Sequence, residues 1–276
     1  MVDDLSFGKK EFLPLSNEKL EFQKCDITDK AALANVLEKF KPEISVHLAA
    51  IHFIPYCNEH PMRTSEVNIM GTRNLLECCR KVKPDILFFA SSAAVYPIRD
   101  GANKEDSSLG PTDIYGLTKV IGEDLTKLFH KETGIKTLIG RLFNVYGPNE
   151  TNPHVIPEIV NQLKSGKRKI SLGNLEPKRD YIHVEDAVTA IITLINEFEG
   201  KFDVFNIGSG KEYSVKQVVQ YAQEALDEKI EIVQDKDRMR KSDRLHLLAD
   251  ISKIQAEVGW KPQWTLKKSL KELIKS

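Results

Sequence analysis

Apolar runs alternate with helical patterns along the first half of the chain. Residues 43–50 (EISVHLAA), 85–96 (DILFFASSAAVY) and 136–147 (KTLIGRLFNVYG) are apolar runs that predict strands, the last of which runs into a loop. Between them, residues 64–82 and 113–132 carry apolar side chains at the spacing of a helix. Buried strands separated by helices are typical of a parallel sheet whose two faces are covered. We therefore expect an α/β fold with a doubly wound parallel sheet and right-handed crossovers.

The pattern changes after Pro148, where short strands and helices follow one another without long apolar runs. At the C-terminal end, apolar residues recur on one helical face and predict a helix that packs against the rest of the protein; they are Leu266, Leu270, Leu273 and Ile274. We therefore expect residues 1–149 to form the main sheet domain. Residues 150–276 form a smaller lobe, with some segments returning to the main sheet.

Composition excludes several classes of protein. The 276 residues are 41% hydrophobic and 29% charged, with 40 basic and 40 acidic side chains. A balanced charge argues against a dedicated nucleic-acid or membrane-surface binder. No apolar run approaches the roughly 18 residues of a membrane span. The cysteines lack a CxxC or zinc-site spacing, so we expect free thiols in a cytoplasmic protein and no metal; they are Cys25, Cys57, Cys78 and Cys79.

Tyr115 and Lys119 stand four residues apart in the sequence DIYGLTK. Such a pair lies on one face of a helix and arises often by chance on a solvated surface. The alternative is a catalytic pair, because Ser92 stands at the C-terminal end of the preceding strand, where open α/β sheets bind ligands. Lowering a phenol pKa of about 10 by ~3 units takes roughly 4 kcal/mol, which a nearby cation can supply.

A series of short motifs follows one another along the chain. They are VDDLS (2–6), CDITD (25–29), VHLAA (46–50), VNIMGTRNLLE (67–77), SSAAVY (91–96), YGLTK (115–119), GRLFNVYGP (140–148), RDYIHVEDA (179–187), FNIGSG (205–210) and VGWKP (258–262). In this order they resemble the extended short-chain dehydrogenases/reductases of the NAD-dependent nucleotide-sugar epimerase/dehydratase family. The resemblance implies a Rossmann-like domain over residues 1–149 and a nucleotide-sugar lobe over residues 150–276.

The resemblance implies a set of residues that bind NAD. Asp3 would grip the adenosine ribose, Asp26 the adenine amino group, and Ile27 would lie against the ring. The other expected cofactor residues are Ala49 and Ala50, where backbone approaches the cofactor, Asn68 as a brace, Phe143 beside the nicotinamide, and the pair Tyr115 and Lys119. Asn68 has a second interpretation as a solvated helix position. For Asp29 we favour a helix cap before residues 30–40.

The resemblance also implies the catalytic and substrate residues. Ser92, Tyr115 and Lys119 would be catalytic, and Ser92 would also hold the substrate oxygen. Asn144, Arg179 and Arg240 would bind the nucleotide diphosphate of a sugar nucleotide, since arginine meets phosphate oxygens bidentately. Arg238 is the alternative to Arg240. His183 is expected to pack within the lobe, with Glu185 and Asp186 as candidate caps of the following helix.

The absence of an acidic pair after Ser92 narrows the range of reactions that we expect. The 4,6-dehydratases of this family carry an Asp-Glu pair after the active-site hydroxyl residue, where this chain has Ala93 and Ala94. We therefore expect an enzyme that resembles UDP-glucose 4-epimerase and acts as a homodimer through helices near 66–82 and 112–131. The stretch SLGNLEPKRDY (171–181) resembles some dehydratases, and a 4-reductase or a C3/C5 epimerase is also open.

The chain contains no G-x-x-G-x-x-G motif, which in this family follows the first strand and holds the cofactor pyrophosphate at a helix N-terminus. We therefore expect the first strand and its glycine loop to be missing from an N-terminally truncated chain. The alternative from another class is an inactive fragment or a pseudo-enzyme.

The missing motif leads to a prediction for the printed chain. We expect the 276 residues to bind NAD weakly and to fold marginally, because a lost central strand leaves backbone groups unpaired. Titration calorimetry of the purified chain with NAD measures this. Tight binding would contradict the expectation.

Overall fold

The computed structural model describes residues 1–14, 16–235 and 245–275. They form two compact units, each assembled from segments that are distant in the sequence. The first unit comprises residues 1–97, 108–141 and 195–205, and the second comprises residues 98–107, 142–194 and 206–276. The boundary expected between residues 149 and 150 stays a prediction.

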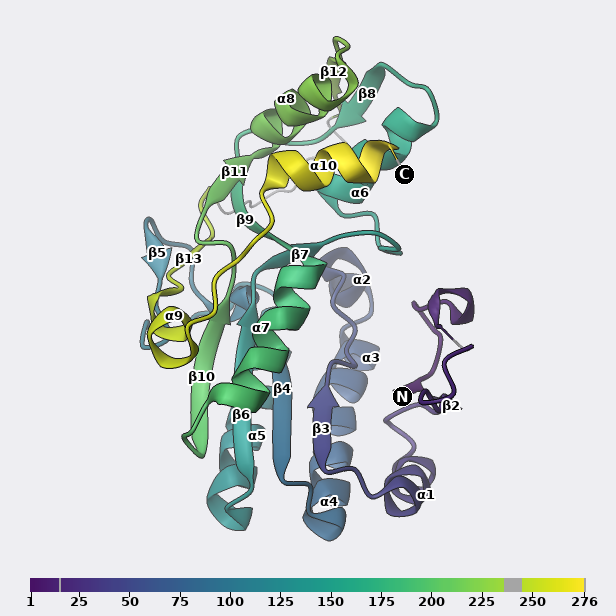
Figure 1. Ribbon diagram of the computed structural model, residues 1–276, viewed down its shortest axis with the longest axis vertical. Helices are drawn as coiled ribbons and strands as arrows, with labels where there is room; N and C mark the ends of the chain where they lie inside the picture. Colours follow the sequence, from purple (N-terminus) through teal and green to yellow (C-terminus); the bar gives the residue numbers. More distant parts are fainter. Residues whose placement is uncertain (15, 236–244, 276) are drawn as a thin grey trace. The chain divides into compact units, whose positions relative to one another are not determined.

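The first unit is built on a four-stranded sheet with the order β10-β6-β4-β3 (Figure 1). Its strands are β3 (Ile44–His47), β4 (Ile86–Ser92), β6 (Lys136–Leu142) and β10 (Phe202–Ile207). Strands β3 and β4 run parallel, with Ile44 opposite Ile86 and His47 opposite Phe89. The apolar runs predicted to be strands thus form the centre of this unit.

Helices connect these strands, as the sequence pattern predicts. They are α1 (Lys30–Phe40), α2 (Ile54–Glu59), α3 (Pro61–Ser65), α4 (Thr72–Val82) and α5 (Ile114–Thr133). Helix α1 packs on α4, and α5 packs on β4. The Asp29 carboxylate accepts a hydrogen bond from Ala32 N at 3.0 Å, which confirms the predicted cap of α1.

The helix predicted over residues 64–82 is interrupted. A π-helical turn, η2 (Glu66–Gly71), separates α3 from α4. Its Asn68 carbonyl accepts a hydrogen bond from the Thr72 hydroxyl at 2.7 Å. Single π-turns inside helices occur frequently at functional sites. This turn contains Asn68, which is 3% exposed.

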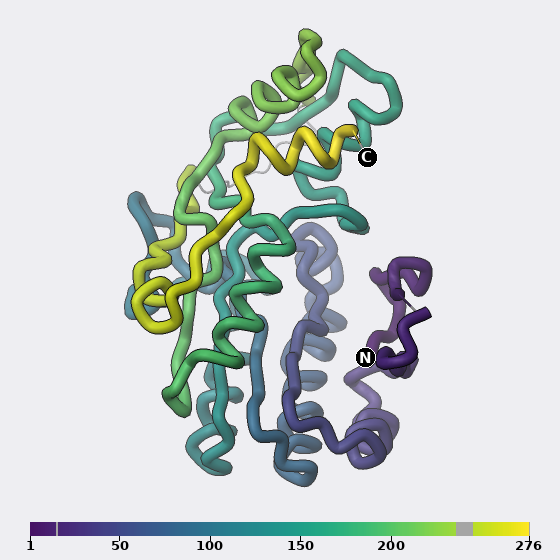
Figure 2. The backbone as a smooth tube through the Cα atoms, in the orientation of Figure 1, coloured from purple at the N-terminus to yellow at the C-terminus, as the bar shows by residue number. Residues whose placement is uncertain are grey.

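The N-terminal segment is separate from the four-stranded sheet. Strands β1 (Val2–Asp3) and β2 (Gln23–Lys24) pair in parallel as a sheet of their own, and a short 3₁₀ turn, η1 (Lys10–Phe12), lies between them. Figure 2 traces this segment in purple, apart from the backbone of β3. Among the described residues β3 is therefore an edge strand, and Ile44 and Val46 are 44% and 42% exposed. Apolar side chains on an open edge favour association with another strand.

In its described residues, the second unit contains three small sheets. One has the order β11-β9-β7, from β7 (Asn144–Tyr146), β9 (Lys178–His183) and β11 (Glu212–Ser214). The two others are parallel pairs: β8 (Lys169–Leu172) with β12 (Glu231–Gln234), and β5 (Ala102–Asn103) with β13 (Leu248–Ala249). The run at 136–147 was predicted to be a strand that runs into a loop. It contains the strand β6 and, in place of the loop, a second strand, β7, which pairs with β9.

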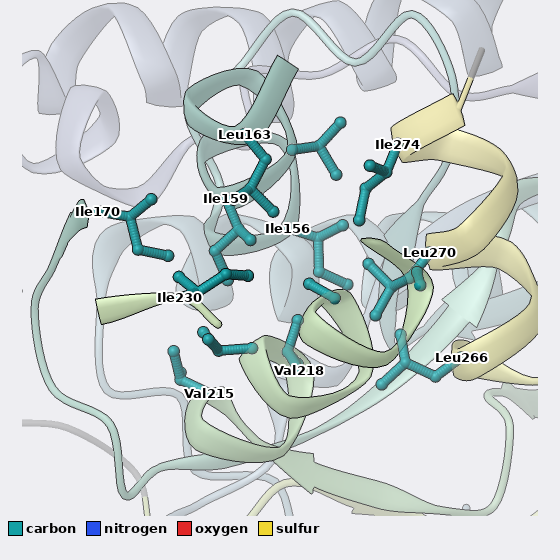
Figure 3. Close-up of a cluster of buried hydrophobic side chains, with 14 of the residues drawn as sticks. Ile156, Ile159, Leu163, Ile170, Val215, Val218, Ile230, Leu266, Leu270 and Ile274 are labelled. Atoms are coloured by element: carbon teal, nitrogen blue, oxygen red, sulfur yellow. The ribbon is translucent and has the colours of Figure 1, made fainter. Parts of the chain in front are cut away.

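The helices of the second unit include α6 (Val155–Lys164), α7 (Val184–Glu197), α8 (Val215–Leu226), α9 (Ser252–Val258) and α10 (Leu266–Lys275). Apolar side chains of α6, α8 and α10 form its hydrophobic core. Helix α10 packs on α8 and α6, and Figure 3 shows Leu266, Leu270 and Ile274 pointing into this cluster. The predicted C-terminal helix and its buried face are confirmed.

The C-terminal segment before α10 is held by two acidic residues at the start of α7. Asp186 accepts hydrogen bonds from Gln263 N and Trp264 N, both at 2.9 Å, and Glu185 accepts one from Trp264 Nε1 at 3.1 Å. Their candidate role as caps of α7 is therefore wrong, because both carboxylates bind backbone and ring N–H groups from another segment. The His183 ring stacks on Trp264 at 4.2 Å, which confirms its packing role.

Two further expectations concern the chain as a whole. All four cysteines are buried free thiols, as predicted. Among the helices in the described ranges, none has the length and apolar character needed to cross a membrane.

Candidate active site

Helix α5 brings Tyr115 and Lys119 into the interior of the first unit. Tyr115 is 9% exposed and Lys119 is 5% exposed, so the alternative of a solvated helix surface is wrong. The helix begins after Asp113, whose carboxylate accepts a hydrogen bond from Gly116 N at 2.7 Å. This cap fixes the first turn of α5, which carries the phenol.

Gly116 allows that first turn to lie against the end of strand β4. A Cβ added there would lie 2.4 Å from the Ala94 carbonyl oxygen and 2.9 Å from the Pro111 Cβ. Because the nearest atom belongs to the backbone, it cannot move away without displacing the turn after β4. The close approach of α5 to β4 therefore depends on glycine at this position.

Replacing Gly116 with Ala is expected to destabilise the protein by about 1–3 kcal/mol, the usual effect of overpacking. The gain in helix propensity is at most about 1 kcal/mol. Urea unfolding measures the loss, and kcat is expected to fall with it because Tyr115 shifts. Lys127→Ala, on the exposed face of α5, is the control. A Gly116→Ala protein as stable as the unsubstituted protein would contradict this packing argument.

The Lys119 ammonium lies in an apolar and aromatic environment. Its Nζ donates a hydrogen bond to the Ala90 carbonyl oxygen at 2.7 Å. It lies 5.2 Å from the centre of the Phe89 ring and 5.8 Å from that of Tyr115. Burial lowers the pKa of Lys119 to about 8. The lysine is therefore a cation at neutral pH and is held beside the phenol ring.

The Tyr115 hydroxyl is protonated in the chain without ligands. Burial raises the pKa of Tyr115 to about 12, and a hydrogen bond with the Ser92 side chain opposes this effect. A neutral phenol becomes a base near pH 7 only when more positive charge lies next to it. The geometry thus gives a tyrosine that a bound cationic group could activate.

Ser92 ends strand β4 and begins the short 3₁₀ turn η3 (Ala93–Val95). Its hydroxyl oxygen accepts a hydrogen bond from Ala94 N at 3.2 Å. Ala93 and Ala94 are 2% and 8% exposed, and neither carries an ionisable group. A hydroxyl, a phenol and an ammonium are therefore brought together, as the sequence predicts, at the carboxyl end of β4.

Asn68 is a brace rather than a solvated residue. Its Oδ1 accepts from Ile51 N at 2.8 Å, and its Nδ2 donates to Ile51 O at 2.9 Å and to Thr118 Oγ1 at 3.0 Å. The side chain joins the loop after β3 to helix α5, next to Lys119. The amide oxygen and nitrogen are both engaged within the protein, so the expected bracing role agrees with the geometry.

The expected adenosine residues lie at the start of the first unit. Asp3 Oδ1 accepts from Leu5 N at 2.6 Å. Asp26 accepts from Thr28 N and Thr28 Oγ1, both at 2.8 Å, and pairs with Arg63 at 2.7 Å. Although burial raises its pKa, these hydrogen bonds and the Arg63 guanidinium hold the pKa of Asp26 below its ordinary value. Asp26 is therefore an acceptor at neutral pH.

The remaining cofactor residues of this unit differ in exposure. Ile27 is 8% exposed, and a Cβ at Gly71 would lie 2.5 Å from its Cδ1. Ala49 is exposed and Ala50 half-buried, in the segment that follows β3.

Phe143, expected beside the nicotinamide, and the expected substrate residues Asn144 and Arg179 lie in the second unit. Phe143 is 4% exposed, and its N–H donates to the Ile207 carbonyl at 2.9 Å. Asn144 begins β7 and is exposed, and the half-buried Arg179 lies on β9, where its Nη1 donates to Lys178 O at 2.8 Å. Arg240 and its alternative Arg238 lie outside the described residues.

Glu123 and Arg141, which were not among the predicted site residues, form a buried ion pair in the first unit. A signal was present, because Tyr115, Lys119 and Glu123 are spaced by four residues and so share one helix face.

The chain is similar to known proteins in sequence and in fold. The model of the family described as GDP-mannose 4,6 dehydratase matches residues 8–273. A UDP-glucose 4-epimerase of Lactobacillus helveticus is 30% identical over 95% of this chain and 84% of its own length. The Thermotoga maritima UDP-glucose 4-epimerase structure with UDP-glucose is 29% identical, with a TM-score of 0.90, covering 99% of this chain and 88% of that one.

A second solved structure is that of the Thermus thermophilus UDP-glucose 4-epimerase in complex with NAD. It is 25% identical, with a TM-score of 0.89, and the match covers 99% of this chain and 89% of that one. These similarities confirm the α/β fold with a parallel sheet.

Proposed function

We propose that this chain, which belongs to the NAD-dependent nucleotide-sugar epimerase/dehydratase family, is a 4-epimerase that interconverts UDP-glucose and UDP-galactose. The observation that carries the proposal is the group of the buried Tyr115 and Lys119 with the half-buried Ser92, beside a turn without carboxylates. Oxidation and re-reduction of one carbinol carbon needs a base and a cation. Expelling water from the neighbouring carbon needs further acid and base groups.

Each of the three side chains has a distinct task in this reaction. The Tyr115 oxygen takes the proton of the sugar 4-hydroxyl and later returns it. The Lys119 ammonium, 5.8 Å from the centre of the phenol ring, favours the phenolate. The Ser92 hydroxyl, hydrogen-bonded to Tyr115 in the chain alone, holds the substrate oxygen in line for this transfer.

The residues of the first unit fit the adenosine and nicotinamide ends of NAD. A Cβ at Gly8 would lie 3.4 Å from Asp3 Oδ1, so glycine there leaves room beside the Asp3 carboxylate for ribose hydroxyls. Asp26 would accept from the adenine amino group, and the small side chains of Ala49 and Ala50 would let the backbone approach. When bound, NAD supplies the hydride acceptor and a positive charge beside Tyr115. The binding of NAD in the structure of the Thermus thermophilus relative supports this assignment.

The substrate is proposed to be a nucleotide diphosphate sugar. Asn144 and Arg179 would contact the diphosphate and Phe143 would lie beside the nicotinamide, as the resemblance implies. The Thermotoga maritima relative, solved with UDP-glucose, supports UDP-glucose as the first substrate to test. The description of the matching family model favours testing a dehydratase activity as the second candidate.

Incubating the purified chain with NAD and UDP-galactose tests the proposed function. The expected product is UDP-glucose, detected by NMR, with no net consumption of NAD. Parallel reactions with GDP-mannose and dTDP-glucose test the dehydratase alternative through a 4-keto-6-deoxy product. Such a product, or turnover of another nucleotide sugar only, would overturn the substrate assignment. No reaction with any of them would favour the pseudo-enzyme.

We further propose that the chain is a homodimer through η2, α4 and α5. On α5, Leu117 and Leu128 are 45% and 50% exposed and lie three turns apart on one face. On η2, Met70 is 48% exposed. Apolar side chains gathered on helix surfaces mark sites of association.

Replacing Leu117 and Leu128 together with Glu is expected to halve the mass in solution, because the substitution places charges in an apolar interface. Sedimentation velocity measures the mass. Lys127→Glu, which adds a negative charge at an exposed position of the same helix, is the control. A double variant with the same mass as the unsubstituted protein would exclude this face as the interface.

A further inference from the structure

Glu123 and Arg141 form a bidentate ion pair inside the first unit. Arg141 Nε donates to Glu123 Oε1 at 2.9 Å, and Arg141 Nη2 donates to Oε2 at 2.8 Å. The side chains are only 8% and 5% exposed. Planar fork-to-fork pairs of this kind fix geometry as well as charge. The pair therefore locks helix α5, which carries Glu123, to strand β6, which carries Arg141.

The same group reaches strand β4. The Ser91 hydroxyl donates to Glu123 Oε1, and Arg141 Nη1 donates to the Tyr96 hydroxyl at 3.0 Å. Ser91 is 2% exposed and stands between Ala90, whose carbonyl accepts from Lys119, and Ser92. Three consecutive residues of β4 are thus bonded to three residues of α5.

The stability of the fold does not by itself require a buried ion pair. Taking two charges out of water costs several kcal/mol, and well-packed apolar residues of similar volume are often equally stable. Glu123 lies one helical turn after Lys119 on α5, on the face that also carries Tyr115, so we expect a role of the pair at this site. The position of Glu123, four residues after Lys119 on the same buried face, supplies one.

We propose that Glu123, held by Arg141 and Ser91, is a positioning residue that fixes Lys119 as a cation against β4 and beside Tyr115. This inference rests on the proposed role of Lys119 in the 4-epimerase reaction. Glu123 touches neither substrate nor cofactor in this account and acts through Lys119 alone.

The electrostatics around Lys119 agree with this role. Burial lowers the pKa of Lys119, whereas the Glu123 carboxylate and the Cys57 thiol raise it. The titratable and charged groups that surround the Lys119–Glu123 face are Tyr115 on α5, His47 on β3, Cys57 on α2, Tyr96 after η3 and Arg141 on β6. The pKa of His47 is lowered to about 3 by burial, so His47 is neutral near pH 7. Glu123 is then the carboxylate next to Lys119 on this face.

The test is a direct titration of Lys119, followed by NMR of the chain labelled with ¹³C at the lysine Cε. The signal is assigned from its loss in Lys119→Met. In Glu123→Gln the pKa of Lys119 is expected to fall by about one pH unit relative to the unsubstituted chain. The double variant Glu123→Gln/Arg141→Met leaves no unpaired buried charge and is expected to show a fall in the same direction. Asp124→Asn removes a carboxylate from the exposed face of α5 and is expected to leave the titration unchanged.

Activity gives a second readout. The alkaline limb of the kcat–pH profile is expected to move to lower pH in both Glu123 variants, whereas a loosened helix alone would lower kcat at every pH. An unchanged Lys119 titration in the folded variants would overturn the proposal even if the protein were a 4-epimerase. Failure of both variants to fold would also overturn it, because the pair would then be required by the fold and not by Lys119. A shifted titration without epimerase activity would retain the positioning role and reject the proposed function.

Discussion

Replacing Tyr115 with Phe is expected to lower kcat by about 10²–10⁴-fold, the usual contribution of a positioned acid or base. The substitution removes one oxygen from a side chain that is 9% exposed and leaves its ring in place. The hydrogen bond to Ser92 is lost, but the packing around the ring is retained. The fold should therefore persist while proton transfer from the sugar hydroxyl stops.

Circular dichroism and urea unfolding check that Tyr115→Phe remains folded. Tyr221→Phe removes a phenol oxygen from α8, in the second unit, and should leave kcat unchanged. A Tyr115→Phe enzyme with the kcat of the unsubstituted protein would exclude Tyr115 as the base.

The pH dependence of the unsubstituted enzyme follows from Lys119. Burial places its pKa at about 8, so it is a cation below that pH and loses its proton above it. The phenolate loses its stabilising charge in the same range. We therefore expect kcat to fall as pH rises through about 8 and expect no such fall in Lys119→Arg, whose side chain stays charged.

Replacing Asp180 with Ala is expected to destabilise the protein by about 3–5 kcal/mol, the range for breaking a buried charged network. Asp180 is fully buried on β9. Its carboxylate accepts from Ser209 N at 2.7 Å, Ser209 Oγ at 2.6 Å, Gly210 N at 2.9 Å and Ala249 N at 3.2 Å. The substitution leaves these donors without their acceptor.

The backbone around Asp180 is closely packed against the carboxylate. A Cβ at Gly208 would lie 2.9 Å from Asp180 Oδ2, and Gly210 has a φ of +71°, so the glycine turn is shaped around this carboxylate. Urea unfolding measures the loss in stability. Glu257→Ala, at an exposed position in the same unit, should change stability by less than about 0.5 kcal/mol. If Asp180→Ala also changed stability by less than about 0.5 kcal/mol, the hydrogen bonds of the Asp180 carboxylate would not stabilise this turn.

The core of the first unit was predictable because its signals are local. The apolar run at 85–96 favours a buried strand, which the structure forms over Ile86–Ser92 before the turn η3. The spacing of Tyr115 and Lys119 needs only one helix to bring them together. The cap at Asp29 is equally local, since its acceptor and donor are three residues apart.

Features that depend on partners far away in the sequence were not predicted from local patterns. The acidic residues Glu185 and Asp186 have the composition of a helix cap, but backbone N–H groups almost 80 residues away in the sequence bind Asp186. The end of the run 136–147, predicted as a loop, contains the strand β7, because it has a partner, β9, that no local pattern reveals. Glu123 shares a helix face with Tyr115 and Lys119, but no local pattern indicates its partner Arg141, which lies 18 residues further on.

The most direct measurement of the central claim follows the hydrogen on the sugar C4. UDP-galactose carrying deuterium at C4 is incubated with the chain and saturating NAD in ordinary water, and the product is examined by mass spectrometry and NMR. Oxidation and re-reduction at one carbon predict UDP-glucose that retains the deuterium at C4, with none of it released to the solvent. Loss of the deuterium to water, or the absence of UDP-glucose, would contradict the account.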